Sequence, residues 1–211
     1  MDFSLETYIR GHIDDEPEWL RRLDRATNIH LLNGRMCSGH IQGRLLKMLV
    51  GMIRPGRALE IGTFSGYSAL CIAEGMEEGA RLDTFEIDDE LEDFILEAFR
   101  SSPHGSKIRL YIGDPASELT AWEPESLDLV FIDADKREYR RYYSLVFPLV
   151  RKGGYIIADN TLWDGHVTEA PDRQAPQTRE IVAFNRMVKE DPRVEVVIIP
   201  LRDGLTIIRK I

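Results

Sequence analysis

The sequence predicts an α/β fold: a Rossmann-like, doubly wound, mostly parallel sheet of seven strands, with N-terminal helices and a C-terminal antiparallel hairpin. Three observations lead to this fold class. Apolar residues in the first third recur every three to four positions, as in amphipathic helices. From residue 57 onwards, short apolar runs alternate with helical stretches, which is typical of a parallel sheet covered on both faces. At the end, two apolar runs are joined by a short turn, which predicts a hairpin.

The predicted N-terminal helices are delimited by the residues at their ends. Pro17 suits the first turn of a helix that runs to about His30. Ser38 is placed to cap the next helix, and the Pro-Gly pair at 55–56 ends it. The periodic apolar residues of this second helix are Ile41, Leu45, Met48, Leu49 and Met52.

The alternating region and the tail supply the strands. Five strands are expected at residues 57–61, 82–87, 108–112, 127–132 and 155–158. The helices between them are expected at about 65–76, 88–99, 116–121 and 139–150. A helix near 178–190 precedes the hairpin, whose strands 194–199 and 205–209 are joined by a turn at 202–204. The sequence contains no internal repeat, low-complexity segment or linker, so we expect a single domain over residues 1–211.

Composition narrows the class of protein. With 43% hydrophobic and 30% charged residues, the 211-residue chain resembles an ordinary globular protein. No apolar run approaches the roughly 20 residues that cross a bilayer, and the start has no signal-peptide core, so we expect a cytoplasmic location and no membrane partner. The net charge of −9 gives no general attraction to nucleic acid. Two cysteines make no disulfide framework, and Cys71, in an apolar pattern, is predicted to be a packed thiol.

A glycine-containing turn follows the first predicted strand, in the segment 60–68. Gly62 and Gly66 allow the backbone to approach a ligand and to turn tightly into a helix. Phe64 replaces the second glycine of the dinucleotide-binding motif, and no Gly-Lys-Ser/Thr of a phosphate-binding loop is present. These features favour a ligand that contains ribose but no pyrophosphate.

Two later strand ends extend this prediction. Glu86 lies 24 residues after Gly62, where a carboxylate can accept hydrogen bonds from ribose hydroxyls. In the segment 113–116, the small residue Ala116 and free backbone amides are placed to border an adenine. The glycine-containing turn, Glu86 and the segment 113–116 lie at the ends of successive strands in this order, and together they indicate a nucleoside-containing ligand.

The next two strand ends carry oxygen ligands. Asp133, Asp159 and Asn160 offer hard donors that suit Mg²⁺ or Ca²⁺, whereas the five histidines are scattered without ligand spacing. A single Asp at a strand end often only caps the next helix, but two neighbouring ends favour a metal site. Lys136 is either a solvated lysine or a general base whose pKa a nearby cation lowers.

These motifs resemble the metal-dependent class I S-adenosylmethionine O-methyltransferases, typified by plant caffeoyl-CoA and animal catechol O-methyltransferases. The resemblance covers residues 36–211 and is densest at 60–68, 131–136 and 159–165, with further agreement at 203–205. It implies S-adenosylmethionine and a divalent cation as cofactors, with Mg²⁺ expected and Ca²⁺ or Mn²⁺ as alternatives. It also implies a homodimer, and a helical segment, residues 1–54, that shapes the acceptor pocket.

The resemblance also implies individual roles. Asp133, Asp159 and Asn160 match the metal ligands, and Lys136 matches the catalytic base, which acts beside Asp133. Trp163 is expected to form an apolar wall for the acceptor ring or simply to pack. Asp164 falls where the plant enzymes carry a substrate-contacting Asn, so this chain departs from the family pattern there. The residues implied to contact S-adenosylmethionine are Ser38, Glu60, Gly62, Thr63, Ser68, Glu86, Ala116 and Asp135.

The predicted reaction is methyl transfer to a catechol-like, vicinal-dihydroxy aromatic small molecule. Lys136 is expected to remove the proton of a hydroxyl held at the metal, after which the oxygen attacks the sulfonium methyl group in line. A different possible acceptor is a 5-hydroxyuridine in tRNA, against which the net charge counts. Two further hypotheses are a nicotinamide-dependent oxidoreductase, disfavoured by the missing second glycine, and a non-catalytic binding protein, disfavoured by the intact lysine and metal ligands.

Overall fold

The computed structural model describes residues 3–211 and confirms the predicted fold class. Seven strands form one sheet in the order β3-β2-β1-β4-β5-β7-β6. The pairs β2–β3, β1–β4 and β4–β5 are parallel, whereas β7 is antiparallel to both β5 and β6. Across residues 3–211, no helix has the length and apolar character needed to span a bilayer.

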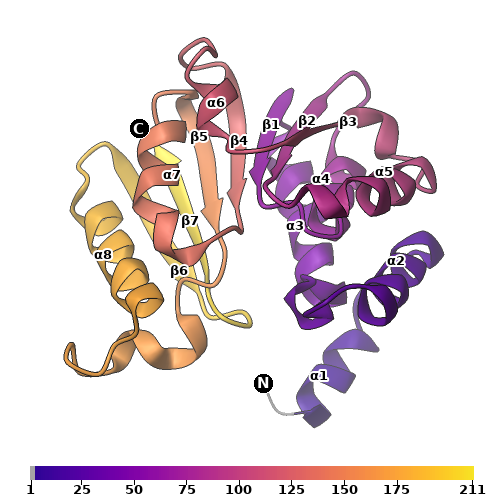
Figure 1. Cartoon of the computed structure of the whole chain (residues 1–211), viewed down its shortest axis with the longest axis horizontal. Coiled ribbons are helices and arrows are strands. Elements are labelled where there is room, and N and C mark those ends of the chain that lie inside the picture. Colours follow the sequence, from indigo (N-terminus) through magenta and orange to yellow (C-terminus); the bar gives the residue numbers. More distant parts are fainter. Residues whose placement is uncertain (1–2) are drawn as a thin grey trace. The chain divides into compact units, whose positions relative to one another are not determined.

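The chain forms two compact units, one from residues up to 56 with 63–112, the other from 57–62 with 113–211. The expectation of a single domain, with residues 1–54 shaping an acceptor pocket, stays a prediction. Figure 1 shows the elements of both units, and each is described below by itself.

The first unit contains the N-terminal helices and two strands. Pro17 is the N-terminal cap residue of α2, one position before the helix, and not part of its first turn as predicted. Ser38 occupies the N-terminal cap position of α3 without a capping side-chain hydrogen bond. The left-handed residue Arg54 ends α3 just before Pro55. Cys71 is fully buried in α4, which confirms the packed thiol. The elements are α1 (Phe3–Arg10), α2 (Glu18–His30), α3 (Gly39–Ile53), α4 (Tyr67–Gly75), β2 (Arg81–Glu86), α5 (Glu92–Arg100) and β3 (Ile108–Ile112).

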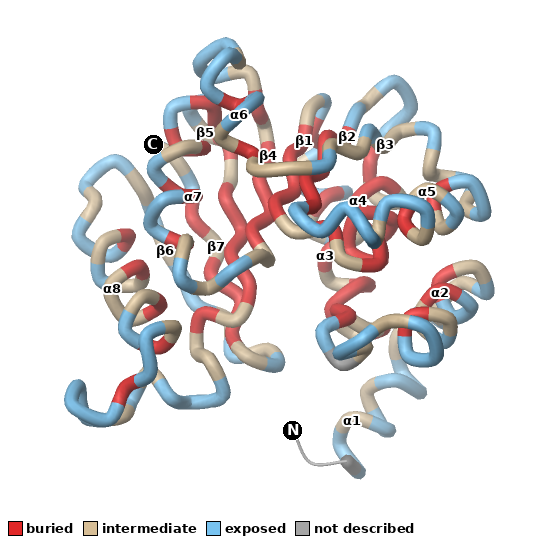
Figure 2. The backbone as a smooth tube through the Cα atoms, in the orientation of Figure 1, coloured by how far each residue is buried: buried red, intermediate tan, exposed pale blue. Residues whose placement is uncertain are grey.

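The second unit contains the other five strands. Its helices α7 and α8 pack against each other (Figure 1). All but one residue of β1 and of β4 are buried, whereas β6 has no buried residue (Figure 2). The elements are β1 (Arg57–Ile61), α6 (Ala116–Leu119), β4 (Leu127–Ile132), α7 (Tyr139–Val146), β5 (Val150–Ala158), α8 (Pro176–Glu190), β6 (Val194–Ile199) and β7 (Leu205–Lys210).

The prediction of a helix over 139–150 and a strand over 155–158 was wrong in its boundaries. α7 ends at Val146 and β5 already begins at Val150. Pro148 cannot donate the hydrogen bond that would continue a helix. The pairing of β4 with β5 shifts register between Leu127 and Leu129, so the early part of β5 is irregular and hides its strand character in the sequence.

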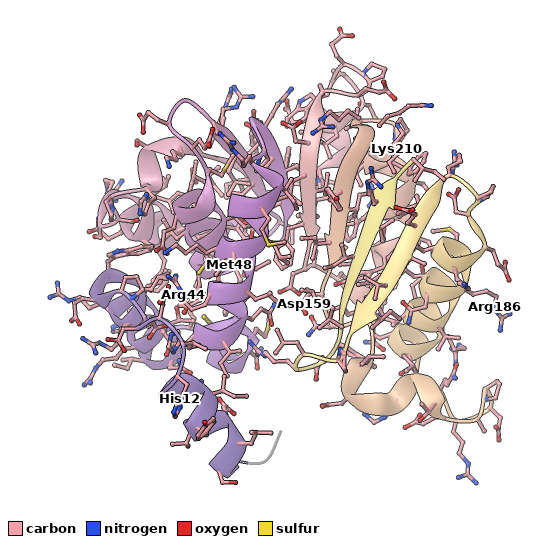
Figure 3. All side chains as sticks on the ribbon, turned by 180° about the vertical axis from the view of Figure 1, so that it is seen from behind. His12, Arg44, Met48, Asp159, Arg186 and Lys210 are labelled. Carbon is pink, nitrogen blue, oxygen red and sulfur yellow. The ribbon has the colours of Figure 1, made fainter. Side chains whose placement is uncertain are left out.

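The strand register brings three chain segments to one edge of the second unit. Ile61 at the end of β1 pairs with Ile132 of β4, and Ile132 pairs with Ala158 of β5. Backbone hydrogen bonds continue one residue further, from the Asp133 amide to the Ile61 carbonyl and from the Asp159 amide to the Ile132 carbonyl, both at 2.9 Å. Figure 3 shows Asp159 and Lys210 at opposite ends of the strands. The edge that carries Asp159 is therefore the predicted ligand-binding edge.

Candidate functional site

Lys136 and Asp133 form an ion pair at the end of β4. The Lys136 Nζ donates to Asp133 Oδ1 at 2.7 Å and to the Tyr139 hydroxyl at 2.8 Å. The side chains of Lys136 and Asp133 are only 11% and 20% exposed, so the pair is shielded from water. Lys136 is therefore an ordered, buried group and not the solvated lysine that was one reading of the sequence.

The pKa of Lys136 is raised above its ordinary value. Burial by itself would lower this pKa, but the negative charge of Asp133 and the hydroxyl of Tyr139 outweigh burial. In this ion pair the lysine is an ammonium group. The lowering of its pKa by a neighbouring cation, expected from the sequence, stays a prediction.

Asp159 and Asn160 follow β5 in a tightly bonded turn. The Asp159 side chain is buried, and its Oδ1 accepts a hydrogen bond from the Asn160 backbone amide at 2.7 Å. Asn160 has a left-handed φ of 55°, a conformation that asparagine tolerates better than most residues. Its Nδ2 donates to Asp203 Oδ2 at 3.4 Å, so the amide oxygen lies on the opposite branch of the side chain.

The donor chemistry of these residues fits a hard divalent cation. Two carboxylates and one amide oxygen are ligands of the kind that Mg²⁺, Ca²⁺ and Mn²⁺ take in proteins. Within residues 3–211 there is no cluster of three or more His, Cys, Asp or Glu side chains suited to a metal. The predicted metal ligands Asp133, Asp159 and Asn160 do not form a cluster of this kind, because Asn160 is not one of these four residue types.

The turn between β6 and β7 supports the loop that follows Asn160. The Asp203 carbonyl accepts hydrogen bonds from the amides of Leu162 at 2.7 Å and Trp163 at 3.2 Å. Burial and the neighbouring carboxylate of Asp164 raise the pKa of Asp203. Trp163 is half-buried and Asp164 exposed, and both have left-handed backbones. Their predicted contacts with the acceptor stay predictions.

In the first unit, the carboxylate of Glu86 is held in a fixed orientation. It accepts three backbone hydrogen bonds, from the amides of Phe64 at 2.7 Å, Ile87 at 2.9 Å and Asp88 at 3.0 Å. Since a carboxylate has about four acceptor positions, one position remains for a further donor. The other predicted cofactor contacts of this unit, Ser38, Thr63 and Ser68, are all buried.

The remaining predicted cofactor contacts lie in the second unit. Glu60 is fully buried in β1, and Gly62 follows that strand with a φ of 99°. Asp135 is exposed and accepts a hydrogen bond from the Arg137 amide, so it caps the short turn that starts at Lys136. A cap is the simple role that strand-end acids often have, and a cofactor contact by Asp135 stays a prediction.

Of the backbone amides in the segment 113–116 that were expected to be free, the amide of Ala116 is occupied. The amide of Ala116 donates to Asp114 Oδ1 at 2.9 Å, and the amide of Ser117 donates to the Asp114 carbonyl at 3.1 Å. Asp114 also pairs with Arg141 at 2.6 Å. Asp114 thus occupies the Ala116 amide that was predicted to be available to an adenine, although the methyl group of Ala116 can still border a ring.

Two residues of this region were missed by the sequence prediction. Tyr139 lies three residues after Lys136, a spacing at which two side chains of a helical turn meet. Asp203 lies in the hairpin turn, far from Asn160 in the chain, and only the turn motif at 203–205 drew attention to it. Both contacts depend on the packing of α7 and of the hairpin against β5.

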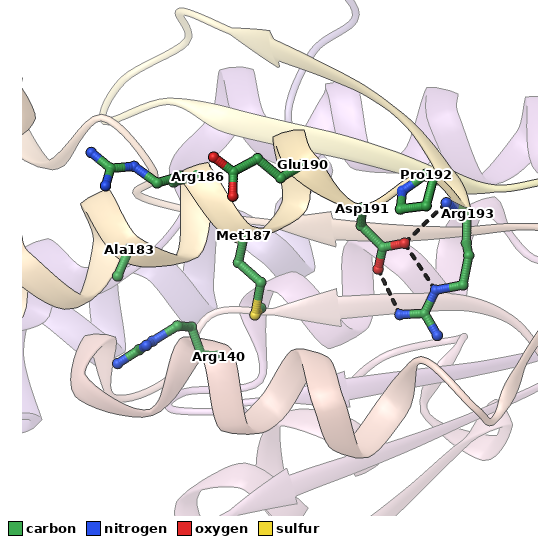
Figure 4. Close-up of a pocket in the computed structure, with 8 residues that line it drawn as sticks. All are labelled: Arg140, Ala183, Arg186, Met187, Glu190, Asp191, Pro192 and Arg193. Carbon is green, nitrogen blue, oxygen red and sulfur yellow. Dashed lines mark hydrogen bonds and ion pairs between the residues drawn. The ribbon is translucent and has the colours of Figure 1, made fainter.

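A surface hollow in the second unit lies apart from these residues. It has a volume of about 590 Å³ and is lined from α7, α8 and the segment that precedes β6 (Figure 4). Two of its arginines already have carboxylate partners, Arg140 with Glu180 and Arg193 with Asp191. No predicted site residue lines this hollow.

Comparisons with known proteins identify the family and agree with the fold. A family model described as "O-methyltransferase" matches residues 10–211, which begins well before the resemblance at residue 36. The caffeoyl-CoA O-methyltransferase 1 of Arabidopsis thaliana is 32% identical over 209 residues, covering 93% of this chain and 79% of the relative. That of Stellaria longipes is 30% identical over 205 residues, covering 93% and 85%. A Podospora anserina methyltransferase solved with S-adenosylhomocysteine superposes with a TM-score of 0.89 at 28% identity, covering 99% and 94%.

Proposed function

The chain belongs to the O-methyltransferase family and is an S-adenosylmethionine-dependent enzyme that methylates small molecules. From this premise we propose that it methylates one hydroxyl of a vicinal-dihydroxy aromatic compound with the help of a divalent cation. The observation that carries the proposal is the shielded Lys136–Asp133 ion pair. It supports the proposal because an amine and a carboxylate lie together at the end of a sheet strand, where ligands bind in this class of fold.

Asp133, Asp159 and Asn160 are the proposed cation ligands. Mg²⁺ is expected because the donors are all hard oxygens, and Ca²⁺ or Mn²⁺ remain alternatives. The hydrogen bond from Asn160 Nδ2 to Asp203 supports the role of Asn160, since it directs the amide oxygen away from that contact. When bound, the cation supplies Lewis acidity that favours ionisation of a hydroxyl.

Lys136 is the proposed general base. As long as Asp133 carries an uncompensated negative charge, this charge keeps the proton on the lysine. Compensation of that charge removes the largest interaction that raises the pKa of Lys136, while burial continues to lower it. The amine then accepts the hydroxyl proton, which leaves an oxygen nucleophile for the methyl group of S-adenosylmethionine.

Recognition of the two substrates follows from the family resemblance. Glu86 is proposed to accept hydrogen bonds from the ribose hydroxyls, which its fixed carboxylate and remaining acceptor position support. Trp163 is proposed as an apolar wall for the acceptor ring, and Asp164 as a contact of that acceptor. The further proposed contacts of S-adenosylmethionine are Ser38, Glu60, Gly62, Thr63, Ser68, Ala116 and Asp135.

Family membership also bears on the competing functions. A nicotinamide-dependent oxidoreductase and a non-catalytic binding protein are both ruled out as readings of this chain, because it belongs to a family of methyl-transferring enzymes. The tRNA acceptor is not favoured by any contact among residues 3–211 and becomes one arm of the test. The homodimer stays a proposal that light scattering can check.

The decisive assay follows transfer of labelled methyl groups from S-adenosylmethionine to a panel of catechols and to bulk tRNA, with Mg²⁺ or with a chelator. We expect transfer to a catechol only when metal is present. Asp133→Ala should abolish turnover, while Asp172→Asn, a change of an exposed acid outside the site, should not alter it. Metal-independent transfer, near-normal activity of Asp133→Ala, or transfer to tRNA alone would each contradict the proposal.

A further inference from the structure

Tyr139 is a fully buried tyrosine whose hydroxyl group joins the two halves of the candidate site. On one side it meets the Lys136 Nζ at 2.8 Å, and on the other it donates to the Asp159 carbonyl at 2.8 Å. The Ile132 carbonyl lies at 3.4 Å from the same hydroxyl. Neither the methyl transfer nor the proposed role of Lys136 as the base assigns a function to the Tyr139 hydroxyl.

The direction of these hydrogen bonds is fixed by chemistry. A phenol has one proton, and both backbone carbonyls near Tyr139 can only accept. The proton is therefore committed to a carbonyl, so toward Lys136 the phenol oxygen can only accept. The carboxylate of Asp133 is likewise an acceptor. Two of the three hydrogens on the Lys136 ammonium are thus held by fixed acceptors.

The third position on the Lys136 nitrogen has a defined direction. Nζ is tetrahedral and has four directions. The bond to Cε takes one and the two fixed hydrogen bonds take two more, so one direction remains. Among residues 3–211, Asp133 and Tyr139 are the side chains that bond this nitrogen. A neutral amine can keep both hydrogen bonds with its two hydrogens, and its lone pair then occupies the third position.

We propose that Tyr139 is a positioning residue, whose hydroxyl orients the Lys136 nitrogen so that its third position meets the acceptor hydroxyl. The inference rests on the proposed function, in which Lys136 is the base. In the transfer, the acceptor O–H bond breaks and an N–H bond forms at Nζ, and the electron pair stays on the acceptor oxygen. Both existing hydrogen bonds of the lysine persist through this step, so little rearrangement is required.

The ring of Tyr139 is a rigid support for this role. It packs edge-on against Phe184 of α8, with ring centroids 5.4 Å apart and an interplanar angle of 88°. Phe184 is itself fully buried. A lysine has a flexible four-carbon stem, so its nitrogen is located only as well as its partners are. An acceptor mounted on a buried ring restricts that nitrogen more than a solvent molecule would.

Tyr139→Phe tests the inference because it removes the hydroxyl and keeps the ring. Tyr143→Phe is a matched control: this second tyrosine of α7 also packs edge-on against Phe184, but its hydroxyl bonds Asp191 at 3.1 Å, not Lys136. We expect Tyr139→Phe to lower kcat for a catechol by about 10- to 100-fold. The KM for the acceptor and the affinity for S-adenosylmethionine should stay unchanged, and the ratio of the two methyl ether products of an asymmetric catechol should shift. Tyr143→Phe should leave all these quantities unchanged.

The outcomes separate this inference from the proposed base. If Lys136→Met abolishes transfer but Tyr139→Phe keeps the wild-type kcat and product ratio, the positioning role is overturned and the base stands. If Lys136→Met keeps wild-type activity, the proposed base fails, and the inference fails with it. Should Tyr139→Phe not fold, 3-fluorotyrosine at position 139 retains the hydroxyl as a weaker acceptor; a lower kcat supports the inference, and an unchanged kcat overturns it.

Discussion

A Cβ atom on Gly62 would lie 2.0 Å from the carbonyl oxygen of Asp133 and 3.1 Å from the Cα of Ala134. The end of β1 therefore touches the backbone that carries the first proposed metal ligand. The sequence suggested that Gly62 is a glycine so that the chain can approach a ligand. The structure adds a second reason, because the protein's own backbone already leaves no space for a side chain.

Gly62→Ala should destabilise the fold through this overlap. Forcing a methyl group into a packed position costs about 1–3 kcal/mol, and the left-handed φ of 99° adds about 1 kcal/mol. Gly165→Ala is the matched control, since Gly165 also has a positive φ of 79° but has nothing within 4 Å of its Cβ position. Urea denaturation should show a clearly larger loss for Gly62→Ala. Equal losses would mean that the β1 end can move away from Asp133.

Asp203 should influence cation binding without being a ligand. Its Oδ2 accepts a hydrogen bond from Asn160 Nδ2 at 3.4 Å and so selects which end of the amide turns toward the other proposed ligands. Residues that orient a metal ligand typically change affinity by about 10- to 100-fold. We therefore expect Asp203→Leu to weaken Mn²⁺ binding by that factor, as measured by electron paramagnetic resonance of free Mn²⁺. Asp203→Asn, which can still accept, should bind nearly as well as the wild type; identical affinity of the leucine variant would refute the orienting role.

Most of the fold was predictable because its strands are short, apolar and separated by clear turns. The strands 57–61, 108–112, 127–132 and 194–199 were placed with the bounds that the structure has. The start of β5 was missed, since its register shift breaks the apolar pattern and Gly153 interrupts it with a φ of 77°. The apolar pattern of a single strand cannot reveal a register shift, because the shift is defined by the pairing with the neighbouring strand.

The candidate site was predictable only where its residues immediately follow strands. Asp133 and Asp159 were found because parallel strands that pair in register end at the same edge. The partners of these residues were not found, because Tyr139 reaches Asp159 only through the packing of α7 beside β5. Asp203 reaches Asn160 only because the hairpin turn lies against the loop after β5. The position of a residue directly after a strand therefore indicates a proposed ligand from the sequence. The residues that orient these ligands come from other elements and are known only once the tertiary packing is known.

The buried ion pair between α3 and α4 should dominate the stability of the first unit. Arg44 bonds Glu74 at 2.6 Å, and the two side chains are only 9% and 10% exposed. Removal of one partner leaves a buried charge unpaired, which costs about 3–5 kcal/mol. We expect such a loss in the free energy of unfolding for Glu74→Gln. Glu97→Gln, which breaks an exposed pair with Arg100, should have no measurable effect, and a similar effect of both changes would show that the buried pair is not special.

Acid should weaken the contact between α7 and the segment that leads into β6. The guanidinium of Arg193 pairs with Asp191 (Figure 4) and lowers the pKa of this carboxylate from 3.8 to about 2, against the opposing effect of burial. The Tyr143 hydroxyl also donates to the Asp191 carboxylate. A pKa that is lower in the folded state means that the carboxylate stabilises the fold above its unfolded pKa, and that this contribution disappears as the pH falls toward about 2. The melting temperature of Asp191→Asn should therefore lie below that of the wild type near neutral pH, and the gap should narrow with acidification below 3.8. A gap that stays constant down to pH 2 would show that the charge of Asp191 does not contribute to stability.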